Sequence, residues 1–161
     1  MSLTVPVGSD HQLARLLQIG VVLEEVVEAR AAKHAELSEA DLDADVREML
    51  TDASAESADH RARLEELIDE LDAETVPFEE IETLVEAQYE VDRDFDGVLY
   101  DQLCNEETAY KFYDDFIAAI EDSETEFSVD REHVLATLRE IREEEAEGVE
   151  EVAEIMEGRE E

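Results

Sequence analysis

The chain has few of the residues that interrupt or cross-link a fold. Its 161 residues include five glycines, two prolines and no tryptophan, and Cys104 is the single cysteine. One cysteine excludes an intrachain disulfide framework and a cysteine-rich zinc or iron site. The abundant residues are Ala, Leu, Val, Glu, Asp and Arg, a composition typical of long helices. We therefore predict an all-α fold in a single domain over residues 1–161, with frayed ends at 1–8 and 157–161.

Long apolar stretches are also missing. The longest apolar-rich run between charged residues, Leu16 to Leu23, is too short to cross a bilayer. Met1 to Gly8 has neither the basic start nor the apolar stretch of a signal peptide. These features predict a cytoplasmic protein without a membrane partner. Phosphate-binding loops, dinucleotide fingerprints and nucleophile elbows are absent from the sequence, so none of the corresponding enzyme classes is indicated.

Basic residues are scarce. Twelve Lys and Arg oppose 49 Asp and Glu, which gives a formal net charge of −37 and predicts no nucleic-acid partner. The acids are spread along the whole chain and only two bases are lysines, a composition that resembles the proteins of halophilic archaea. Concentrated cations would screen the self-repulsion, so we interpret the acidity as adaptation to high salt. An acidic solvating protein, the alternative, would more naturally carry its charge in one block.

Apolar residues recur at helical spacing in the first half of the chain. Ser9 and Gln12 have the spacing of a capping box at the start of a helix predicted over about 10–36. A second helix is predicted over about 39–73, and Pro77 follows its end. These two segments therefore predict the first helical pair.

The second half predicts another pair. A third apolar stripe runs from Phe95 to Ile120, and a fourth helix follows Asp130, a suitable N-cap, and frays from Glu157. Residues 78–91 predict a short helix between the two pairs. Two helical pairs with a long connection between them predict a four-helix bundle with one long, partly helical crossover between its second and third helices.

A polar residue interrupts each apolar stripe near its middle. The interruptions are Glu24, His60, Glu106 and Glu145, and Glu56 or Ser57 shares the face of His60. Four such side chains facing one another need compensation, because an unpaired buried charge is very unfavourable. A divalent metal ion supplies it, and carboxylates with an imidazole suit iron or manganese. The pattern therefore predicts a metal site at mid-bundle.

Two runs resemble segments of the rubrerythrin branch of the ferritin-like superfamily. Residues 106–113, Glu-Glu-Thr-Ala-Tyr-Lys-Phe-Tyr, are similar to its third-helix segment, in which a Glu precedes a Phe-Tyr pair. Residues 141–148 are similar to its fourth-helix segment, where Glu-rich sequence leads into Glu-x-x-His. The resemblance covers nearly the whole chain. It implies a ferritin-like bundle that holds one or two ions, acts on dioxygen or peroxide as an oxidoreductase or peroxidase or stores metal, and self-associates, with a dimer favoured.

The resemblance also implies a ligand set. Carried over residue by residue, its members are Glu24, His60, Glu106 and Glu145, with Glu106 or its partner bridging the ions and His60 a terminal ligand. Ser57 and Gly148 stand where the family motif has a Glu and a His, and the nearest substitutes are Glu56 and Glu144. The single cysteine excludes the rubredoxin unit that rubrerythrins proper carry.

Two interpretations stay open. In the first, the chain is a carboxylate protein that binds iron or manganese. In the second, it is a degenerate bundle without metal that serves as an interaction or scaffold module, and Ser57 and Gly148 favour this reading. Its interior carboxylates would then be paired with Arg, Tyr or water, or stay protonated. In both, Tyr110 and Tyr113 are predicted in the core, and Cys104 is predicted buried and inert.

Overall fold

Helices make up the regular structure of the part of the chain that the structure describes. The structure is a computed structural model that describes residues 6–35, 44–75 and 98–160. Its helices are α1 (Asp10–Ala35), α2 (Ala44–Glu70), α4 (Val98–Glu121) and α5 (Arg131–Glu160). No strand occurs within these ranges. The prediction of an all-α chain with four long helices is therefore confirmed.

Side-chain caps fix two of the helix starts. The backbone N–H of Gln12 donates to Ser9 Oγ at 3.1 Å, which confirms Ser9 as the N-cap of α1. The side chain of Gln12 accepts from the N–H of Gly8 at 2.6 Å rather than from that of Ser9, so the expected capping box is only half formed. At α5, the N–H of Glu132 donates to Asp130 Oδ1 at 3.1 Å, which confirms the predicted cap.

Some predicted boundaries differ from the structure. Helix α2 ends at Glu70 instead of residue 73, and α5 extends to Glu160, past the point at which the sequence predicts fraying. The predicted start of the second helix, near residue 39, and the short helix predicted over 78–91 lie outside the described residues.

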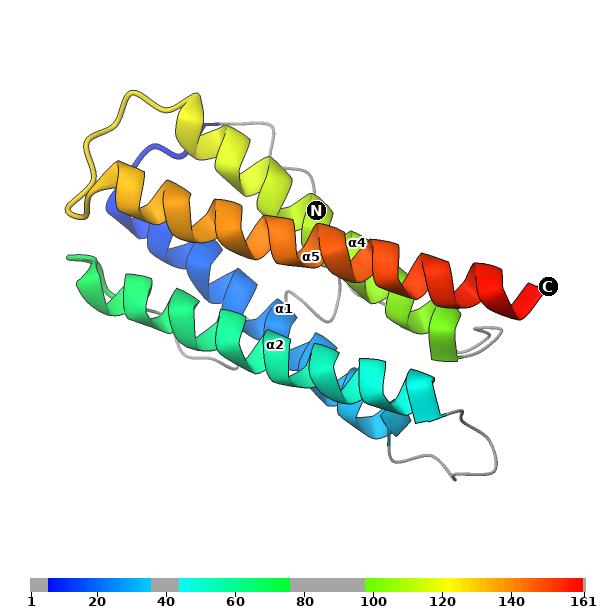
Figure 1. Cartoon of the computed structure of the whole chain (residues 1–161). Helices are drawn as coiled ribbons and strands as arrows, with labels where there is room; N and C mark the ends of the chain where they lie inside the picture. The colour runs from blue at the N-terminus through cyan, green and yellow to red at the C-terminus, as the bar shows by residue number, and fades with distance from the viewer. Residues whose placement is uncertain (1–5, 36–43, 76–97, 161) are drawn as a thin grey trace.

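The helices are arranged as two antiparallel pairs, α1 with α2 and α4 with α5 (Figure 1). The pairs meet where α1 lies beside α4 and α2 beside α5. Helix α2 ends at one end of the bundle and α4 begins at the other, so α2 and α4 run in the same direction (Figure 1). A connection between two parallel helices of a bundle has to travel the length of the bundle. This helix order fits the predicted long crossover, whose own course lies outside the described residues.

The bundle core consists of two apolar clusters. The larger one occupies the end where α1 begins and includes Leu13, Leu17, Leu64, Leu67, Phe116, Ile120, Leu138 and Ile141. The smaller one contains Val46, Met49, Leu50 and Val152. Along every helix the polar interruption predicted from the sequence falls between the residues of the two clusters. The core thus consists of three layers, with a polar layer between two apolar clusters that shield it on both sides.

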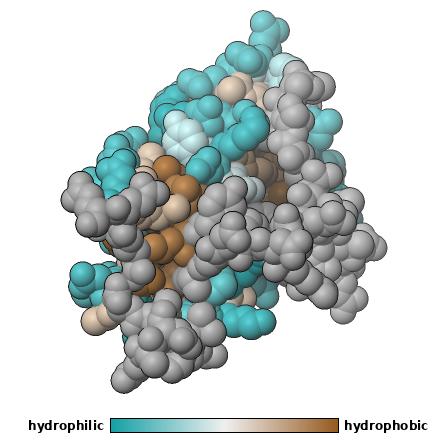
Figure 2. Space-filling view, turned by 90° about the vertical axis from the view of Figure 1, so that its right-hand side faces the viewer, coloured by the Kyte–Doolittle hydropathy of each residue, from teal (hydrophilic) through white to brown (hydrophobic). Residues whose placement is uncertain are grey.

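The smaller cluster lies toward the end of the bundle where α1 ends and α2 begins. Its partly buried neighbours include Ala35 in the last turn of α1, Leu99 in the first turn of α4, and Ile155 near the end of α5. Figure 2 views this end and shows hydrophobic residues toward the middle of the face and hydrophilic residues farther out. None of the described helices combines the length and apolar character that crossing a membrane requires.

Candidate metal centre

The polar layer includes four nearly inaccessible carboxyl or imidazole side chains, one from each helix. Their exposed fractions are 0% for Glu24, 1% for His60, 6% for Glu106 and 2% for Glu145. Each shares a helical face with core residues of its own helix, such as Leu17 for Glu24 and Leu64 for His60, so the apolar neighbours determine where the polar side chain points. The predicted inward orientation of all four is confirmed, and their role as ligands stays a prediction.

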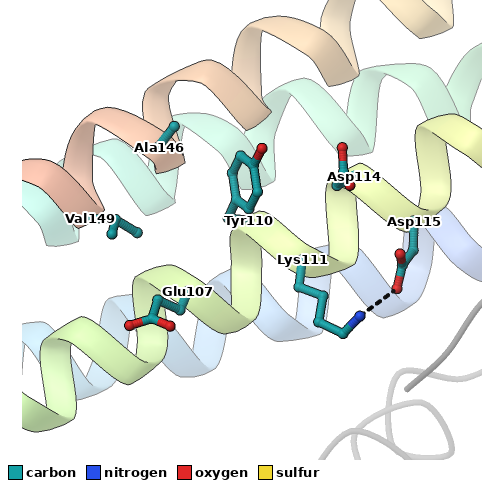
Figure 3. A pocket seen from close by; sticks show the side chains of 7 residues that line it. All are labelled: Glu107, Tyr110, Lys111, Asp114, Asp115, Ala146 and Val149. Atoms are coloured by element: carbon teal, nitrogen blue, oxygen red, sulfur yellow. Dashed lines mark hydrogen bonds and ion pairs between the residues drawn. The ribbon is translucent and has the colours of Figure 1, made fainter.

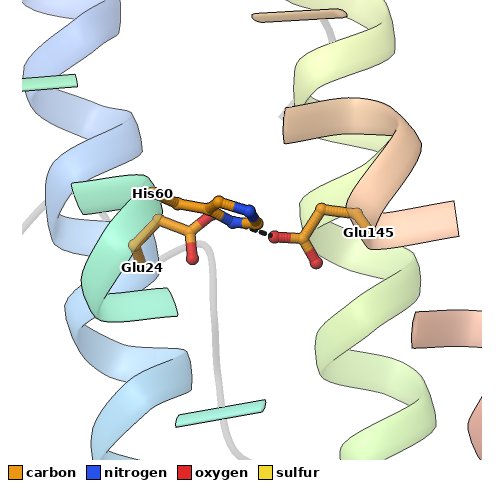
Figure 4. Close-up of side chains that lie close together, drawn as sticks. All are labelled: Glu24, His60 and Glu145. Carbon is orange, nitrogen blue, oxygen red and sulfur yellow. Dashed lines mark hydrogen bonds and ion pairs between the residues drawn. The ribbon is translucent and has the colours of Figure 1, made fainter. Parts of the chain in front are cut away.

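The ring of His60 lies between an inner and an outer pair of carboxylates. Its Nδ1 atom is 3.3 Å from Glu24 Oε1 and 3.0 Å from Glu145 Oε1 (Figure 4). Its Nε2 atom is 3.0 Å from Glu144 Oε2 and 3.8 Å from Glu56 Oε1. The outer pair is partly open to solvent, since 33% of the Glu144 side chain and 41% of the Glu56 side chain are exposed. One imidazole therefore connects a buried carboxylate pair to a pair at the surface.

Both nitrogens of His60 face carboxylate oxygens, which are acceptors when ionised. Burial lowers the pKa of His60, but the hydrogen bond and charge of Glu24, with Glu144 and Glu56, more than offset this, so the pKa lies above its ordinary value of 6.5. The metal-free site therefore favours the protonated form of His60, with carboxylates on both sides of the ring.

The two oxygens of Glu24 have different environments. Oε1 accepts a hydrogen bond of 2.6 Å from the hydroxyl of Tyr113. Burial, together with the charges of Glu24 and Glu145, raises the pKa of Tyr113 well above its usual value, so this hydroxyl stays a donor. Oε2 is buried and has no hydrogen-bond partner among the described residues. A buried carboxylate oxygen without a partner is unfavourable, and a cation beside it would remove the deficit.

Three of the four side chains can share one metal ion. Glu24, His60 and Glu145 each offer a ligand atom, and these atoms lie within 4.8 Å of one another. Donors around a single transition-metal ion lie at most about 4.5 Å apart, because each bond is about 2.0–2.3 Å long. Movements of a few tenths of an ångström would therefore bring the three donors, which we call the triad, onto one ion.

Known proteins add no further constraint. No protein-family model matches the chain. Searches of curated proteins and of solved structures found no significant match either. The function of the triad must therefore be argued from its own geometry and chemistry.

Glu106 lies beside the triad rather than within it. Its Oε1 accepts a hydrogen bond of 2.8 Å from Gln102 Nε2, and its carboxyl group is also hydrogen-bonded to Glu145. Burial raises the pKa of Glu106, and burial and the charge of Glu24 raise that of Glu145 well above its ordinary value. Two acids in contact in a dry layer are expected to keep a proton between them.

The substitutes predicted for the two missing ligands take different positions. Ser57 is 4% exposed and occupies the inward-facing position on α2. Its neighbour Glu56 is more exposed, and its carboxylate approaches His60 only from the Nε2 side. Glu144 is also on the Nε2 side, where Arg63 Nη2 lies 3.3 Å from its Oε1. The structure therefore brings Glu56 and Glu144 to Nε2 of His60, whereas Glu24 and Glu145 lie at Nδ1.

Several polar neighbours of the site carry no distinct signal in the sequence. Gln102 is completely buried, and its place one helical turn before Glu106 is the only hint of their hydrogen bond. The hydroxyl of Tyr113 reaches Glu24 across the bundle, although the sequence predicts Tyr113 only as a core residue. Contacts between helices of this kind depend on their relative rotation, which a single stripe does not define.

Two core predictions on α4 need correction. Tyr110 is 38% exposed, so its assignment to the core is wrong. It lines a groove of about 460 Å³ between α4 and α5 together with Ala146 and Val149, and none of the residues that line this groove belongs to the triad (Figure 3). Cys104 is half-buried rather than fully buried. Both residues lie at the sides of the α4 stripe, where the other helices cover less of the surface.

Replacing Gly148 with alanine is expected to destabilise the fold relative to the same change at Gly158. A Cβ at 148 would lie 2.7 Å from Glu106 Oε2, whereas a Cβ at 158 meets nothing within 4 Å. Alanine improves helix propensity by at most about 1 kcal/mol at either site. At 148 the displaced carboxyl group would also lose its bond to Gln102, a cost of about 1–3 kcal/mol. Chemical denaturation of both variants checks this, and equal gains in stability would contradict it.

Proposed function

We propose that this chain is a ferritin-like carboxylate protein that binds iron or manganese at Glu24, His60 and Glu145. The observation that carries the proposal is that Oε2 of Glu24 is buried and has no hydrogen-bond partner among the described residues. His60 and Glu145 each offer a further ligand atom that could bind the same ion as Glu24. The helix order, with α2 parallel to α4, supports it, as does the resemblance of residues 106–113 and 141–148 to ferritin-like segments.

The surrounding residues fit a cation. Glu24 and Glu145 can neutralise a divalent charge, and His60 can bind through Nδ1, the nitrogen that faces them. Nε2 would keep its contact with Glu144, an outer partner of the kind that orients metal-bound imidazoles. Tyr113 donates to Oε1 of Glu24 and so directs Oε2 away from itself.

Bound iron or manganese would supply reactivity toward dioxygen or peroxide, which makes an oxidoreductase, a peroxidase or a metal store the function class we propose. The contribution of the chain is to hold the site dry. Apolar clusters lie on both sides of the polar layer, and the carboxylates of Glu56 and Glu144 are the partly exposed acids nearest to His60. We propose that small reactants and ions, not macromolecules, are its partners.

Elemental analysis tests the proposal. Protein reconstituted with Fe²⁺ or Mn²⁺ in concentrated KCl and freed of unbound ion should contain near-stoichiometric metal, and His60→Ala should lose it, because a ligand is removed. His133→Ala is the matched control, since its side chain is 53% exposed at the start of α5. Less than about a tenth of an equivalent in the unaltered protein would rule the proposal out.

A metal-free scaffold or interaction module is the second candidate. The observation that favours it is the state of His60, whose two nitrogens already have carboxylate partners without any ion. Under this reading the polar layer is a hydrogen-bonded network in which two buried oxygens of the described residues, Glu24 Oε2 and Gln102 Oε1, have no hydrogen-bond partner. The same elemental analysis separates the candidates, because a scaffold binds no ion at the triad.

A further inference from the structure

The position of Glu106 bears on how many ions the site accepts. If the proposed metal function holds, a second ion beside the triad would need its own donors on the Glu106 side of the layer. The two positions that would supply them by the family pattern are occupied by Ser57 and Gly148. Neither offers a carboxylate or an imidazole, so the space beside Glu106 has no further strong donor from these two positions.

Glu106 itself fills the space that Gly148 leaves. A Cβ at 148 would lie 2.7 Å from Oε2, 2.9 Å from Cδ and 3.2 Å from Oε1 of Glu106. These distances are shorter than ordinary van der Waals contact, so the carboxyl group lies directly against the α5 backbone where a larger residue would begin. The position of Glu106 therefore depends on residue 148 having no side chain.

Glu106 is also held in that position. Gln102 donates to its Oε1 from one helical turn earlier, and Glu145 is hydrogen-bonded to the same carboxyl group. Gln102 is completely buried and cannot turn toward solvent. The ligand group that the structure brings together consists of Glu24, His60 and Glu145, without Glu106.

Charge balance agrees with this arrangement. The carboxylates of Glu24 and Glu145 together neutralise one divalent ion when the imidazole is neutral. A second ion would add two positive charges to a layer that lies between apolar clusters, and Glu106 could neutralise only one of them, so the remaining charge would be very unfavourable.

We infer that the chain binds a single metal ion at Glu24, His60 and Glu145, and that Glu106 is a positioning residue that holds Glu145 rather than a ligand that bridges two ions. The inference rests on the proposed metal function and specifies it further. The chemistry of one ion differs from that of a pair, because a single centre has no second metal with which to share electrons.

Ion stoichiometry tests the inference directly. Mn²⁺ is added to metal-free protein in concentrated KCl, and bound ion per chain is measured by elemental analysis together with the electron paramagnetic resonance spectrum. The unaltered protein should bind one ion and give the spectrum of isolated Mn²⁺, without exchange coupling. Glu106→Gln, whose amide can still donate to Glu145, should keep one ion and weaken binding by at most about tenfold.

Glu145→Gln is the matched ligand variant and should bind no ion at the same free Mn²⁺. Glu106→Leu cannot hydrogen-bond to Glu145 and should weaken binding about 10- to 100-fold without changing the stoichiometry. Two exchange-coupled ions in the unaltered protein, or loss of all ion in Glu106→Gln, would overturn the inference while leaving the metal function intact. No ion in the unaltered protein would overturn both.

Discussion

Replacing Glu145 with glutamine is expected to stabilise the metal-free protein and, at the same time, to abolish ion binding. Glu145 is 2% exposed and lies against two other buried acids, so its ionised form is disfavoured: burial, followed by the charge of Glu24, raises its pKa well above the ordinary value. An amide of the same shape carries no charge. At neutral pH the native protein has to retain a proton on this carboxyl group that the unfolded chain releases, and glutamine removes this cost, which we expect to be about 1–3 kcal/mol.

The hydrogen bonds around residue 145 survive this substitution. The amide oxygen can accept from His60 Nδ1, which lies 3.0 Å from Glu145 Oε1. The amide nitrogen can donate to Glu106, the present hydrogen-bond partner of Glu145. The melting temperature in concentrated KCl without metal should therefore rise by roughly 3–10 °C for a domain of this size.

The appropriate control is Glu143→Gln on the same helix, because Glu143 is exposed and should change the melting temperature little. With saturating Mn²⁺ the unaltered protein should have a higher melting temperature than the Glu145→Gln variant. An ion that binds only the native state at 1,000 times its dissociation constant adds about 4 kcal/mol of stability, and the Glu145→Gln variant would not receive this. A Glu145→Gln variant that is less stable than Glu143→Gln without metal would show that the acid at 145 has a structural role.

The polar layer could be predicted from the sequence, because helical periodicity indicates which side chains face the core even in a very acidic chain. Val21 and Val27, each three residues from Glu24, are apolar, and their burial fixes the direction in which Glu24 points. The same reasoning placed His60, Glu106 and Glu145 in the interior. It does not depend on the number of surface acids, since those lie on the other faces of the helices.

The arrangement within the layer was not accessible in this way. A stripe specifies that Glu106 points inward, but not that its carboxyl group lies against Gly148 and beside Glu145 instead of within the triad. It also leaves open which nitrogen of His60 faces which acid. These features depend on the rotation of each helix, the rotamers of long side chains and interhelical distances, to which sequence periodicity is insensitive.

The stability of the metal-free protein is expected to fall as the pH rises from about 4.5 to above 7. Burial is the main cause that raises the pKa of Glu56 to about 7, with His60 opposing it and the nearby carboxylates reinforcing it. Burial also raises the pKa of Glu106 and of Glu145, and the carboxylates around His60 raise its pKa above 6.5. All of these groups bind protons more tightly in the native than in the unfolded state.

The sign follows from proton linkage. Where the native state binds more protons, the free energy of unfolding falls by about 1.4 kcal/mol per pH unit for each extra proton. The carboxyl contributions are complete below about 4.5 and are lost as the pH rises toward each native pKa. The His60 contribution is complete below 6.5 and is lost above it. Glu56 contributes less than the buried groups, because its exposed part is screened by solvent and salt.

Urea unfolding of the metal-free protein at several pH values in concentrated KCl measures this slope. The acidic surface also favours lower pH, so the informative quantity is the difference between the unaltered protein and the double variant Glu56→Gln with Glu145→Gln, whose slope should be shallower. Identical slopes would place the pH dependence on the surface alone. Mn²⁺ binding to the unaltered protein should strengthen over the same range, because an ion at the triad displaces the protons that the metal-free site retains.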